Sequence, residues 1–469
     1  MSFLGIPYAA APVGPRRFLP PSRPEPWTAP RDATTPGPTA PQLSAETSVS
    51  KLLPRALIAG EDYLNLNVWT ADTDGSRPVM VFVHGGSFTS GSGAISTYDG
   101  TRFARDGIVL VTINYRLGAD GFLWFGSGTP NLGLLDQVAA LTWVRENIAA
   151  FGGDPDNVTI FGESAGAMSV CTLLAMPAAA GLFGRVIAQS GAAECVISPD
   201  AARRTGERLA EILGTPPSRE AIGEVPVPRL LQAQAQLAQE VWATPDPHQW
   251  GEVARNLMPF EPVVDGHILP AAPIDVIGAG LESRVDLLLG TNSEEGRLFF
   301  VPLGVAEAAD DQALARYARD RSISDAVVDV YRRTRPTASP GDLICALMTD
   351  SFYRLPALRL AENHGMAHVY EFGWGSPAHS GTLGACHALE IPFVFDNLDD
   401  PGYSTMLGAS PPQDVADSMH RAWVAFATTG DPGWPCYAAS DRGVMHFGAD
   451  GGLRIDERAA ERRAWSTAS

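Results

Sequence analysis

The stretch VTIFGESAG, residues 158–166, decides the fold of this chain. An apolar, β-branched run at residues 158–161 breaks directly into Gly162-Glu163-Ser164-Ala165-Gly166, and a helix-compatible segment follows at residues 165–176. A strand, a tight turn at a serine with small neighbours, and a helix form a nucleophile elbow, which exposes the serine hydroxyl at the top of a sheet. The pattern therefore predicts that Ser164 is a nucleophile.

Further apolar runs on both sides of the elbow have the length and β-branched content of strands. Runs that are apolar throughout suit a parallel sheet covered by helices on both faces. A helical pattern at residues 134–150 predicts a crossover helix. The predicted class is α/β with a mostly parallel central sheet flanked by helices. Its expected strands are residues 63–69, 79–83, 108–113, 158–161, 186–188, 285–289, 368–372, and a closing hairpin of 444–447 and 453–455.

The chain has 469 residues, more than the roughly 250–300 that one hydrophobic core usually serves. No repeat or Gly/Ser linker divides it, so we expect one enlarged catalytic domain, residues 1–469. Helical patterns at about 199–250 and 305–363 predict insertions that cap the substrate mouth. The first 60 residues are rich in proline and small residues and are expected to wrap the surface as loops and short turns.

Composition argues against several classes of partner. The formal net charge of −19 repels nucleic-acid phosphate and anionic lipid, and no run of 18 apolar residues could span a membrane. The five cysteines lack CxxC spacing, so we expect free thiols and no zinc site. No signal peptide is visible, which predicts a cytoplasmic protein. Arginine replaces lysine almost everywhere, Lys51 being the exception, as in a GC-rich bacterial gene. No oligomeric state follows from these features.

Ser164 needs a base, and that base needs a carboxylate to fix its tautomer. In folds with a nucleophile elbow the chain order is serine, acid, histidine. His387, in GACHALEIPFVFDN, is the best-placed histidine. The acid should follow a strand, and LLLGTNSEEG offers both Glu294 and Glu295, between which spacing does not choose. Asp265 also lies in the window, but an Asp-Gly pair is typical of a turn.

The loop His84-Gly85-Gly86-Ser87-Phe88 follows a predicted strand and lets the backbone approach a ligand closely. We expect the N–H groups of Gly86, Ser87 and Ala165 to form an oxyanion hole. A glycine pair could instead bind phosphate, but GxGxxG and GK[ST] spacings are missing. Six aromatic residues are candidates for an apolar substrate pocket, and we expect about a third of them to line it, because most aromatic residues belong to the core. The six are Phe88, Trp124, Phe260, Phe299, Phe300 and Phe352.

Taken together, these motifs resemble the type-B carboxylesterase family, which includes bacterial p-nitrobenzyl-type esterases and the cholinesterases. The matching segments occur in order along essentially the whole chain: FLGIPYAAAPVGPRRF, EDYLNLNVW, HGGSF, NYRLGADGFL, NLGLLDQVAALTWVRENIAAFGGDPDNVTIFGESAGA, QSG, GTNSEEG, HALEIPFVF and GDPGWPCY. The resemblance implies an α/β-hydrolase fold and a serine hydrolase that cleaves short- to medium-chain carboxylic esters. It implies a small ester as substrate and no metal or organic cofactor.

The resemblance also assigns roles that spacing leaves open. The family's catalytic acid precedes the glycine of the acidic motif, which matches Glu295, and its histidine matches His387. Glu163 and Ser190 match positions that support the triad through buried hydrogen bonds, and Glu390 matches an acid that is usually structural.

Three departures from the family pattern accompany these matches. The usual N-terminal β-hairpin is missing, which puts the stability of residues 3–18 in doubt. Tyr63 stands where secreted animal members carry a disulfide cysteine, and Ser87 replaces the last glycine of the oxyanion loop while keeping its N–H.

Two other functions remain open on the sequence. A scaffold protein resembling neuroligin would keep the fold and lose the serine. An interfacial lipase would need a large apolar lid, whereas the insert at residues 229–242 contains glutamines and charges.

Overall fold

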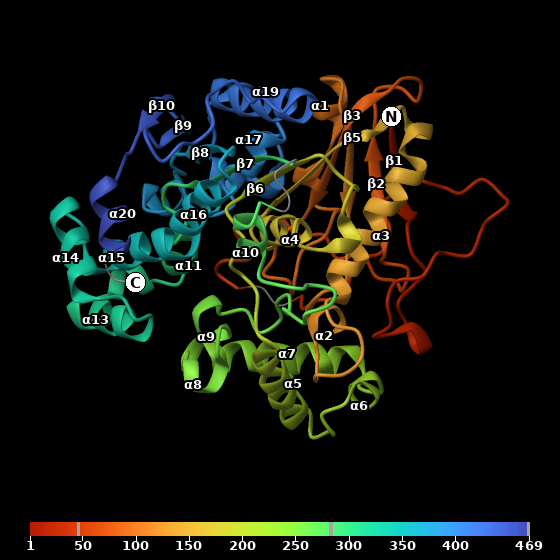
Figure 1. The fold of residues 1–469 in the computed structure, drawn as a ribbon, viewed down its shortest axis with the longest axis horizontal. Helices are drawn as coiled ribbons and strands as arrows, with labels where there is room; N and C mark the ends of the chain where they lie inside the picture. The colour runs from red at the N-terminus through yellow and green to blue at the C-terminus, as the bar shows by residue number, and fades with distance from the viewer. Residues whose placement is uncertain (45–46, 281–284, 467–469) are drawn as a thin grey trace.

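A twisted sheet of ten strands runs through the computed structural model, which describes residues 1–44, 47–280 and 285–466 (Figure 1). The strands are Ser2–Pro7 (β1), Asn65–Trp69 (β2), Arg77–Val83 (β3), Val109–Ile113 (β4), Gly153–Glu163 (β5), Arg185–Gln189 (β6), Asp286–Asn292 (β7), His368–Phe372 (β8), Gly443–Phe447 (β9) and Gly452–Ile455 (β10). Their spatial order is β1-β2-β4-β3-β5-β6-β7-β8-β9-β10. The pairs from β4 to β9 are parallel, and β1, β2 and β10 pair antiparallel at the two edges.

Helices cover both faces of this sheet, as the uninterrupted apolar strands predicted. The helices are Thr101–Arg105 (α1), Gly118–Phe122 (α2), Leu132–Asn147 (α3), Ala165–Leu173 (α4), Pro199–Leu213 (α5), Arg219–Gly223 (α6), Val227–Ala243 (α7), Pro247–Trp250 (α8), Val253–Asn256 (α9), Pro273–Gly278 (α10), Arg297–Phe300 (α11), Val305–Ala308 (α12), Asp311–Asp320 (α13), Asp325–Thr334 (α14), Pro340–Met348 (α15), Leu355–His364 (α16), Ile391–Val394 (α17), Ser404–Leu407 (α18), Gln413–Thr429 (α19) and Ala459–Ser466 (α20). Within the described ranges, no helix combines the length and apolarity needed to cross a membrane.

The side chains of β3 point alternately into the two main hydrophobic cores, one on each face of the sheet. Val79, Val81 and Val83 face the core shared with α3, α4 and α16, whereas Met80 and Phe82 face the core shared with α1, α17 and α19. Successive strand residues point to opposite faces, so one buried strand supplies both layers. Strand β5 pairs with β3 on one side and β6 on the other, which places its carboxyl end at the middle of the sheet. The α/β-hydrolase class expected from the sequence is thus confirmed.

Most of the two predicted helical insertions lies outside the sheet layers, but the prediction is wrong for the end of the second one, because α16 packs on β7 and β8. In Figure 1, helices α5 to α9 gather below the sheet, and α13 and α14 form a lobe on the left. Helix α5 packs on α7, and the second lobe has its own core, which includes Leu314, Val327 and Leu347. Both lobes adjoin the edge where the parallel strands end at their carboxyl termini, the usual location of ligands in α/β sheets.

The expectation of loops for the first 60 residues is wrong at residues 2–7. Strand β1 pairs antiparallel with β2, and the amino group of Met1 donates to Thr70 O at 2.7 Å. Gly5 has a φ of 68° and Pro7 ends the strand, and the register shifts between Phe3 and Ile6. Glycine and proline weaken the local strand signal, so the pairing becomes visible only when β2 is present as a neighbour.

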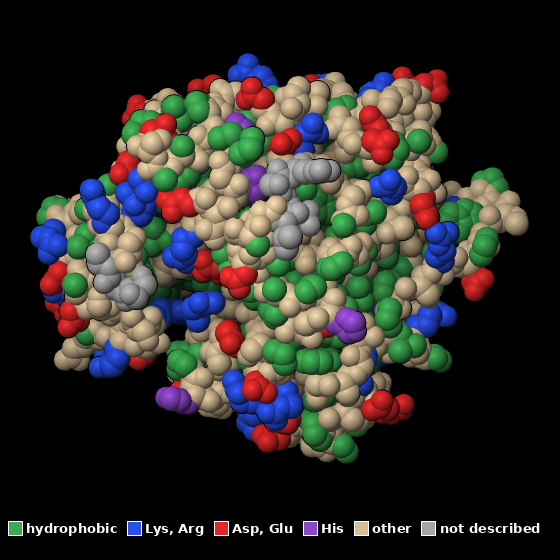
Figure 2. All heavy atoms as spheres, viewed as in Figure 1, with side chains coloured by type: hydrophobic (Ala, Val, Ile, Leu, Met, Phe, Trp, Pro, Cys, Tyr) green, Lys and Arg blue, Asp and Glu red, His purple; other side chains and the backbone are tan. Residues whose placement is uncertain are grey.

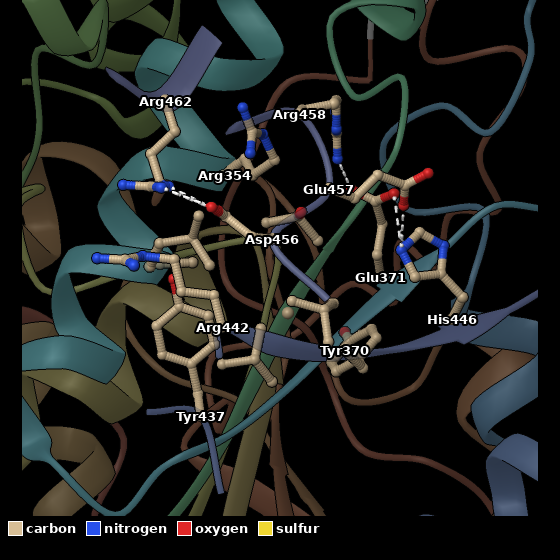
Figure 3. A pocket seen from close by; sticks show the side chains of 16 residues that line it. Arg354, Tyr370, Glu371, Tyr437, Arg442, His446, Asp456, Glu457, Arg458 and Arg462 are labelled. Atoms are coloured by element: carbon tan, nitrogen blue, oxygen red, sulfur yellow. Dashed lines mark hydrogen bonds and ion pairs between the residues drawn. The ribbon is translucent and has the colours of Figure 1, made fainter. Parts of the chain in front are cut away.

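An ionic cluster ties the C-terminal segment to β8 and β9 (Figure 3). His446 Nε2 lies 2.9 Å from Glu457 Oε2 and 3.6 Å from Glu371 Oε1, and Arg458 pairs with Glu371. Arg462 donates to Asp456 at 2.9 and 3.0 Å. Among the described residues, Glu371, His446 and Glu457 also form the one group whose ligand atoms could hold a metal ion. The cluster shares no lining residue with the cavity at Ser164.

Candidate active site

Ser164 occupies a strained turn between β5 and α4. Its φ is 56° and its ψ is −122°, a conformation that costs a residue with a side chain about 1–3 kcal/mol. Backbone hydrogen bonds hold the turn, because the Ser164 N–H donates to Gln189 O and the Met168 N–H donates to Ser164 O, each at 2.9 Å. A Cβ added to Gly162 would meet the Gly166 carbonyl carbon at 2.5 Å. The glycines of GESAG therefore let the turn close against itself.

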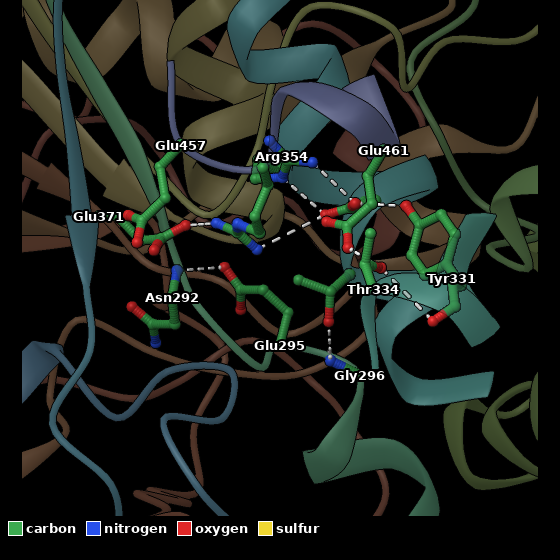
Figure 4. Close-up of polar contacts among 12 residues, drawn as sticks. Asn292, Glu295, Gly296, Tyr331, Thr334, Arg354, Glu371, Glu457 and Glu461 are labelled. Carbon is green, nitrogen blue, oxygen red and sulfur yellow. Dashed lines mark hydrogen bonds and ion pairs between the residues drawn. The ribbon is translucent and has the colours of Figure 1, made fainter. Parts of the chain in front are cut away.

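His387 lies opposite, in the loop that precedes α17. Its Nδ1 is 2.7 Å from Glu295 Oε2. The other carboxylate oxygen of Glu295 accepts the Asn292 N–H at 2.8 Å, as Figure 4 shows. Glu295 is fully buried and is 92 residues away from His387 in the chain. A carboxylate on Nδ1 fixes the tautomer in which Nε2 is free to accept a proton.

Glu163 lies on the other side of the same imidazole. Its Oε1 is 3.1 Å from His387 Nε2, and Glu163 is also buried. A third buried carboxylate, Glu390, accepts hydrogen bonds from Gln189 Nε2 at 3.1 Å and Asn292 Nδ2 at 2.7 Å. The imidazole is thus surrounded by three acidic side chains inside the protein.

These charges determine how the site titrates. Burial by itself lowers the pKa of His387, but the charges of Glu163 and Glu295 outweigh it and hold that pKa above its ordinary value. Burial raises the pKa of Glu163, and the nearby imidazole of His387 opposes this increase. Burial and the charge of Glu295 also raise the pKa of Glu390, to about 6. The pKa values of His387, Glu163 and Glu390 are thus all raised, by neighbouring charges for the imidazole and mainly by burial for the two carboxyl groups.

The other acids and histidines considered in the sequence lie elsewhere. Glu294 pairs with Arg297 at 2.7 Å and accepts the Ala385 N–H at 3.0 Å. Asp265 accepts the N–H groups of residues 268 and 269 in a turn. His84 stacks on Tyr115, with ring centroids 4.5 Å apart, and His420 Nδ1 is hydrogen-bonded to Val394 O at 2.7 Å.

The loop after β3 adjoins the elbow. A Cβ on Gly85 would meet Glu163 Oε2 at 2.8 Å and the Ser164 Cβ at 3.1 Å, and a Cβ on Gly86 would collide with Ser90 O. In the part of the chain that the structure describes, the N–H groups of Gly86 and Ser87 donate to no other residue. Ala165 is the first residue of α4, where N–H groups lack an intrahelical acceptor. These three N–H groups are available to a ligand.

A cavity of about 400 Å³ contains Ser164 and His387. Of the six aromatic residues proposed for its wall, Phe299 and Phe352 line it. The other four do not line it, because Phe88, Phe260 and Phe300 are buried in the cores and Trp124 packs against one of these cores. Aromatic type alone does not distinguish a pocket wall from a core position.

The sequence analysis did not identify several residues that lie near the imidazole of His387. The rings of Tyr353 and Phe299 pack on His387 with centroids 4.9 and 5.3 Å away. Tyr353 follows no recognisable motif, whereas Asn292 lies inside GTNSEEG and was a detectable candidate. Ser190, predicted as a support, has a φ of 52° and donates its N–H to Gly290 O at 2.8 Å. Its buried hydroxyl has no hydrogen-bond partner among the described residues.

Comparisons with known proteins agree with this geometry. A family model described as the carboxylesterase family matches residues 1–464. The chain is 38% identical to the para-nitrobenzyl esterase of Bacillus subtilis, over 98% of this chain and 93% of that protein. It is 35% identical to the phenmedipham hydrolase of Pseudarthrobacter oxydans, over 96% and 92%. A solved Geobacillus stearothermophilus carboxylesterase has a TM-score of 0.85 at 38% identity, covering 99% of this chain and 96% of that one.

Proposed function

Because the chain belongs to the carboxylesterase family, we propose that Ser164, His387 and Glu295 are its catalytic triad. The observation that carries this proposal is the 2.7 Å contact between His387 Nδ1 and Glu295 Oε2, next to a serine on a strained elbow. The protein is a carboxylic-ester hydrolase, and these residues supply the nucleophile, base and orienting acid that such a reaction needs.

The proposed reaction has two stages. Ser164 Oγ attacks the ester carbonyl while His387 Nε2 takes the hydroxyl proton, and the proton then passes to the departing alkoxide, so that the alcohol leaves and an acyl-enzyme remains. Water attacks this acyl group with His387 again as base, and the acid and free Ser164 are released. Glu295 stabilises the imidazolium formed in each stage and fixes the tautomer of His387.

The oxyanion that develops on the substrate carbonyl in the transition state needs hydrogen-bond donors. We propose the free N–H groups of Gly86, Ser87 and Ala165, each of which would lower the barrier by about 3–4 kcal/mol if placed like other oxyanion donors. A serine at residue 87 suffices, because the donor belongs to the backbone. The reaction requires no metal or organic cofactor in this scheme, since the protein supplies every proton and charge that moves.

Glu163 and Ser190 are proposed as positioning residues. Glu163 lies 3.1 Å from the ring nitrogen that must accept the serine proton, a contact that holds the imidazole and adds negative charge beside it. Catalytic hydrogen bonds often tighten only when substrate is bound, so this contact suits the free enzyme. Ser190 lies in the turn after β6, next to the Gln189 carbonyl that anchors Ser164.

The charge of Glu163 has a measurable effect on the pH profile. His387 must be neutral to act as base, so its raised pKa moves the acid limb of kcat/KM to higher pH. Removing one carboxylate lowers that pKa, and we expect Glu163→Gln to shift the acid limb about one unit toward lower pH. Rates measured from pH 5 to 9 on a neutral ester test this. Glu207→Gln removes an exposed carboxylate on α5 and should leave the limb in place. A limb that does not move in Glu163→Gln would contradict the assignment.

We propose short- to medium-chain esters as substrates, because the cavity at Ser164 is about 400 Å³ and the cap helices α7 and α9 form part of its wall. The test is hydrolysis of p-nitrophenyl esters from acetate to palmitate by the purified chain. We expect kcat/KM to peak at short or medium acyl groups and to fall steeply beyond them, without activation when the substrate forms micelles. Activation at that threshold with long chains would instead indicate a lipase, and no turnover of any ester would overturn the function.

We propose one catalytic domain for residues 1–469, because strands from both ends of the chain join one sheet and the family match spans residues 1–464. We propose a cytoplasmic protein without nucleic-acid or membrane partners. Its support is the net charge of −19 and five free cysteines, as expected in a reducing compartment.

A further inference from the structure

The cavity at Ser164 leads to a second cavity of about 210 Å³. The two have five lining residues in common: Arg255, Asn256, Arg321, Ser351 and Phe352. This shared wall is built by the end of α9, the residue after α13, and the π-helix Thr349–Arg354 that precedes α16. Any substrate that extends beyond the catalytic cavity toward the second one therefore passes two guanidinium groups.

Both guanidinium groups lack an acidic partner. Across residues 1–44, 47–280 and 285–466, neither Arg255 nor Arg321 forms an ion pair, although acidic residues outnumber basic ones by 53 to 34 in the whole chain. Glu194, on the wall of the second cavity, is paired with Arg359, which donates to its carboxylate at 2.8 and 2.9 Å. Among the described residues, no carboxylate therefore lies within ion-pair distance of either guanidinium group.

Hydrogen bonds through the buried residues Asn256 and Glu261 hold the side chain of Arg255 in place. Asn256 Nδ2 donates to Glu261 Oε2 at 2.8 Å, which leaves Asn256 Oδ1 to accept from Arg255 Nε at 3.2 Å. Burial raises the pKa of Glu261 to about 8, and Glu261 forms no ion pair with Arg255. Two buried polar residues orient this side chain and leave its charge available.

Arg321 is anchored beside it. One terminal nitrogen of Arg321 donates to the backbone oxygen of Arg255 at 3.4 Å, and its guanidinium carbon lies 4.8 Å from the centre of the Tyr317 ring. These contacts use a carbonyl and a ring face, so none of them removes the charge. Figure 2 shows basic side chains bordering a hollow between the α13–α14 lobe and the α8–α9 part of the cap.

The rest of the path from Ser164 to this junction is mainly apolar. Leu257, Met258, Leu298, Phe299 and Met348 line the catalytic cavity. A molecule that fits both regions has an apolar body near the ester and a negative group at some distance from it. A carboxylate suits the junction, because the planar guanidinium donates two parallel hydrogen bonds to it.

We propose that the preferred substrates are esters bearing a carboxylate remote from the scissile bond, and that Arg255 and Arg321 bind this carboxylate. The proposal rests on the function proposed above, since it concerns the substrate class of the same site. The overall charge of −19 repels anions, and the two arginines offset that repulsion locally, at the junction of the two cavities.

Matched pairs of esters test the proposal. The anionic probes are the monomethyl esters of succinic, adipic and suberic acid, and the neutral probes are methyl butyrate, hexanoate and octanoate, which place a methyl group where the diacids carry a carboxylate. Released methanol gives kcat/KM for each, and the ratio of anionic to neutral kcat/KM is the readout, because changes that affect both esters alike cancel.

The wild type should prefer at least one anionic ester over its neutral match. We expect Arg255→Gln and Arg321→Gln each to lower that ratio about tenfold, mainly through KM, as loss of a charge-assisted hydrogen bond predicts. The wild-type ratio should also fall with added salt. Arg316→Gln is the matched control, because Arg316 lies on α13, the helix that Arg321 follows, is exposed and lines neither cavity.

The outcomes separate the two proposals. If the enzyme hydrolyses neutral esters but Arg255→Gln and Arg321→Gln leave the ratio of anionic to neutral kcat/KM unchanged, the carboxylate site is overturned. The esterase function is then still supported. A wild type that disfavours every anionic ester would also overturn the carboxylate site. Failure to hydrolyse any ester, neutral or anionic, would overturn the proposed function itself. Thermal unfolding of each variant shows whether it is folded before its ratio is compared.

Discussion

Replacing Ser164 by alanine is expected to lower kcat on p-nitrophenyl butyrate by about a millionfold, to the rate left by binding and the oxyanion hole alone. The reason is that no other hydroxyl group takes the place of the nucleophile: the elbow presents one serine at the carboxyl end of β5, and small residues surround it. The measurement is steady-state hydrolysis by wild type and Ser164→Ala, purified side by side so that contaminating esterase is equal in both.

The control for this variant is its stability. The Ser164 hydroxyl makes no hydrogen bond to another described residue, and the backbone bonds that hold the turn survive the change. We therefore expect a free energy of unfolding within about 0.5 kcal/mol of the wild type. A folded Ser164→Ala that keeps more than a small fraction of the activity would refute the nucleophile. Equal inactivity of both proteins would favour the scaffold alternative.

The second large effect concerns the two neighbouring acids. Glu295→Gln should lower kcat about ten-thousandfold, because an amide on Nδ1 of His387 can hold the wrong tautomer and cannot stabilise the imidazolium. The wild-type contact is 2.7 Å, and the other oxygen of Glu295 is fixed by the Asn292 N–H. KM should change little, since the substrate does not touch this buried side chain.

Glu294→Gln is the matched control for that experiment. It makes the same chemical change one residue earlier, on a side chain that pairs with Arg297 and is directed at the Ala385 N–H. We expect its kcat to stay within about tenfold of the wild type, as for the loss of a partly exposed ion pair. If Glu294→Gln were inactive and Glu295→Gln active, the acid would have been assigned to the wrong residue.

Local patterns were sufficient for the fold. The apolar strands, the crossover helix and the elbow are short-range features, and their positions in the structure differ from the predicted ones mostly at the ends of elements. The family follows from the order of long motifs and is confirmed by the match to residues 1–464. The N-terminal strand β1 escaped because its glycine and proline give little local signal, and its pairing with β2 joins segments about 60 residues apart.

What the sequence determined by itself is therefore the fold class, the elbow serine and a short set of partners for it, since these depend on residue type and spacing along the chain. Spacing alone did not choose between Glu294 and Glu295 as the acid. In the tertiary structure Glu295 contacts His387, whereas Glu294 pairs with Arg297. Only the tertiary structure shows that Glu163 approaches His387 Nε2 and which two aromatic residues line the cavity. The same holds for the contact between Arg255 and Arg321. Each joins residues far apart in the chain, and such contacts depend on how the cap and sheet pack, which no local pattern records.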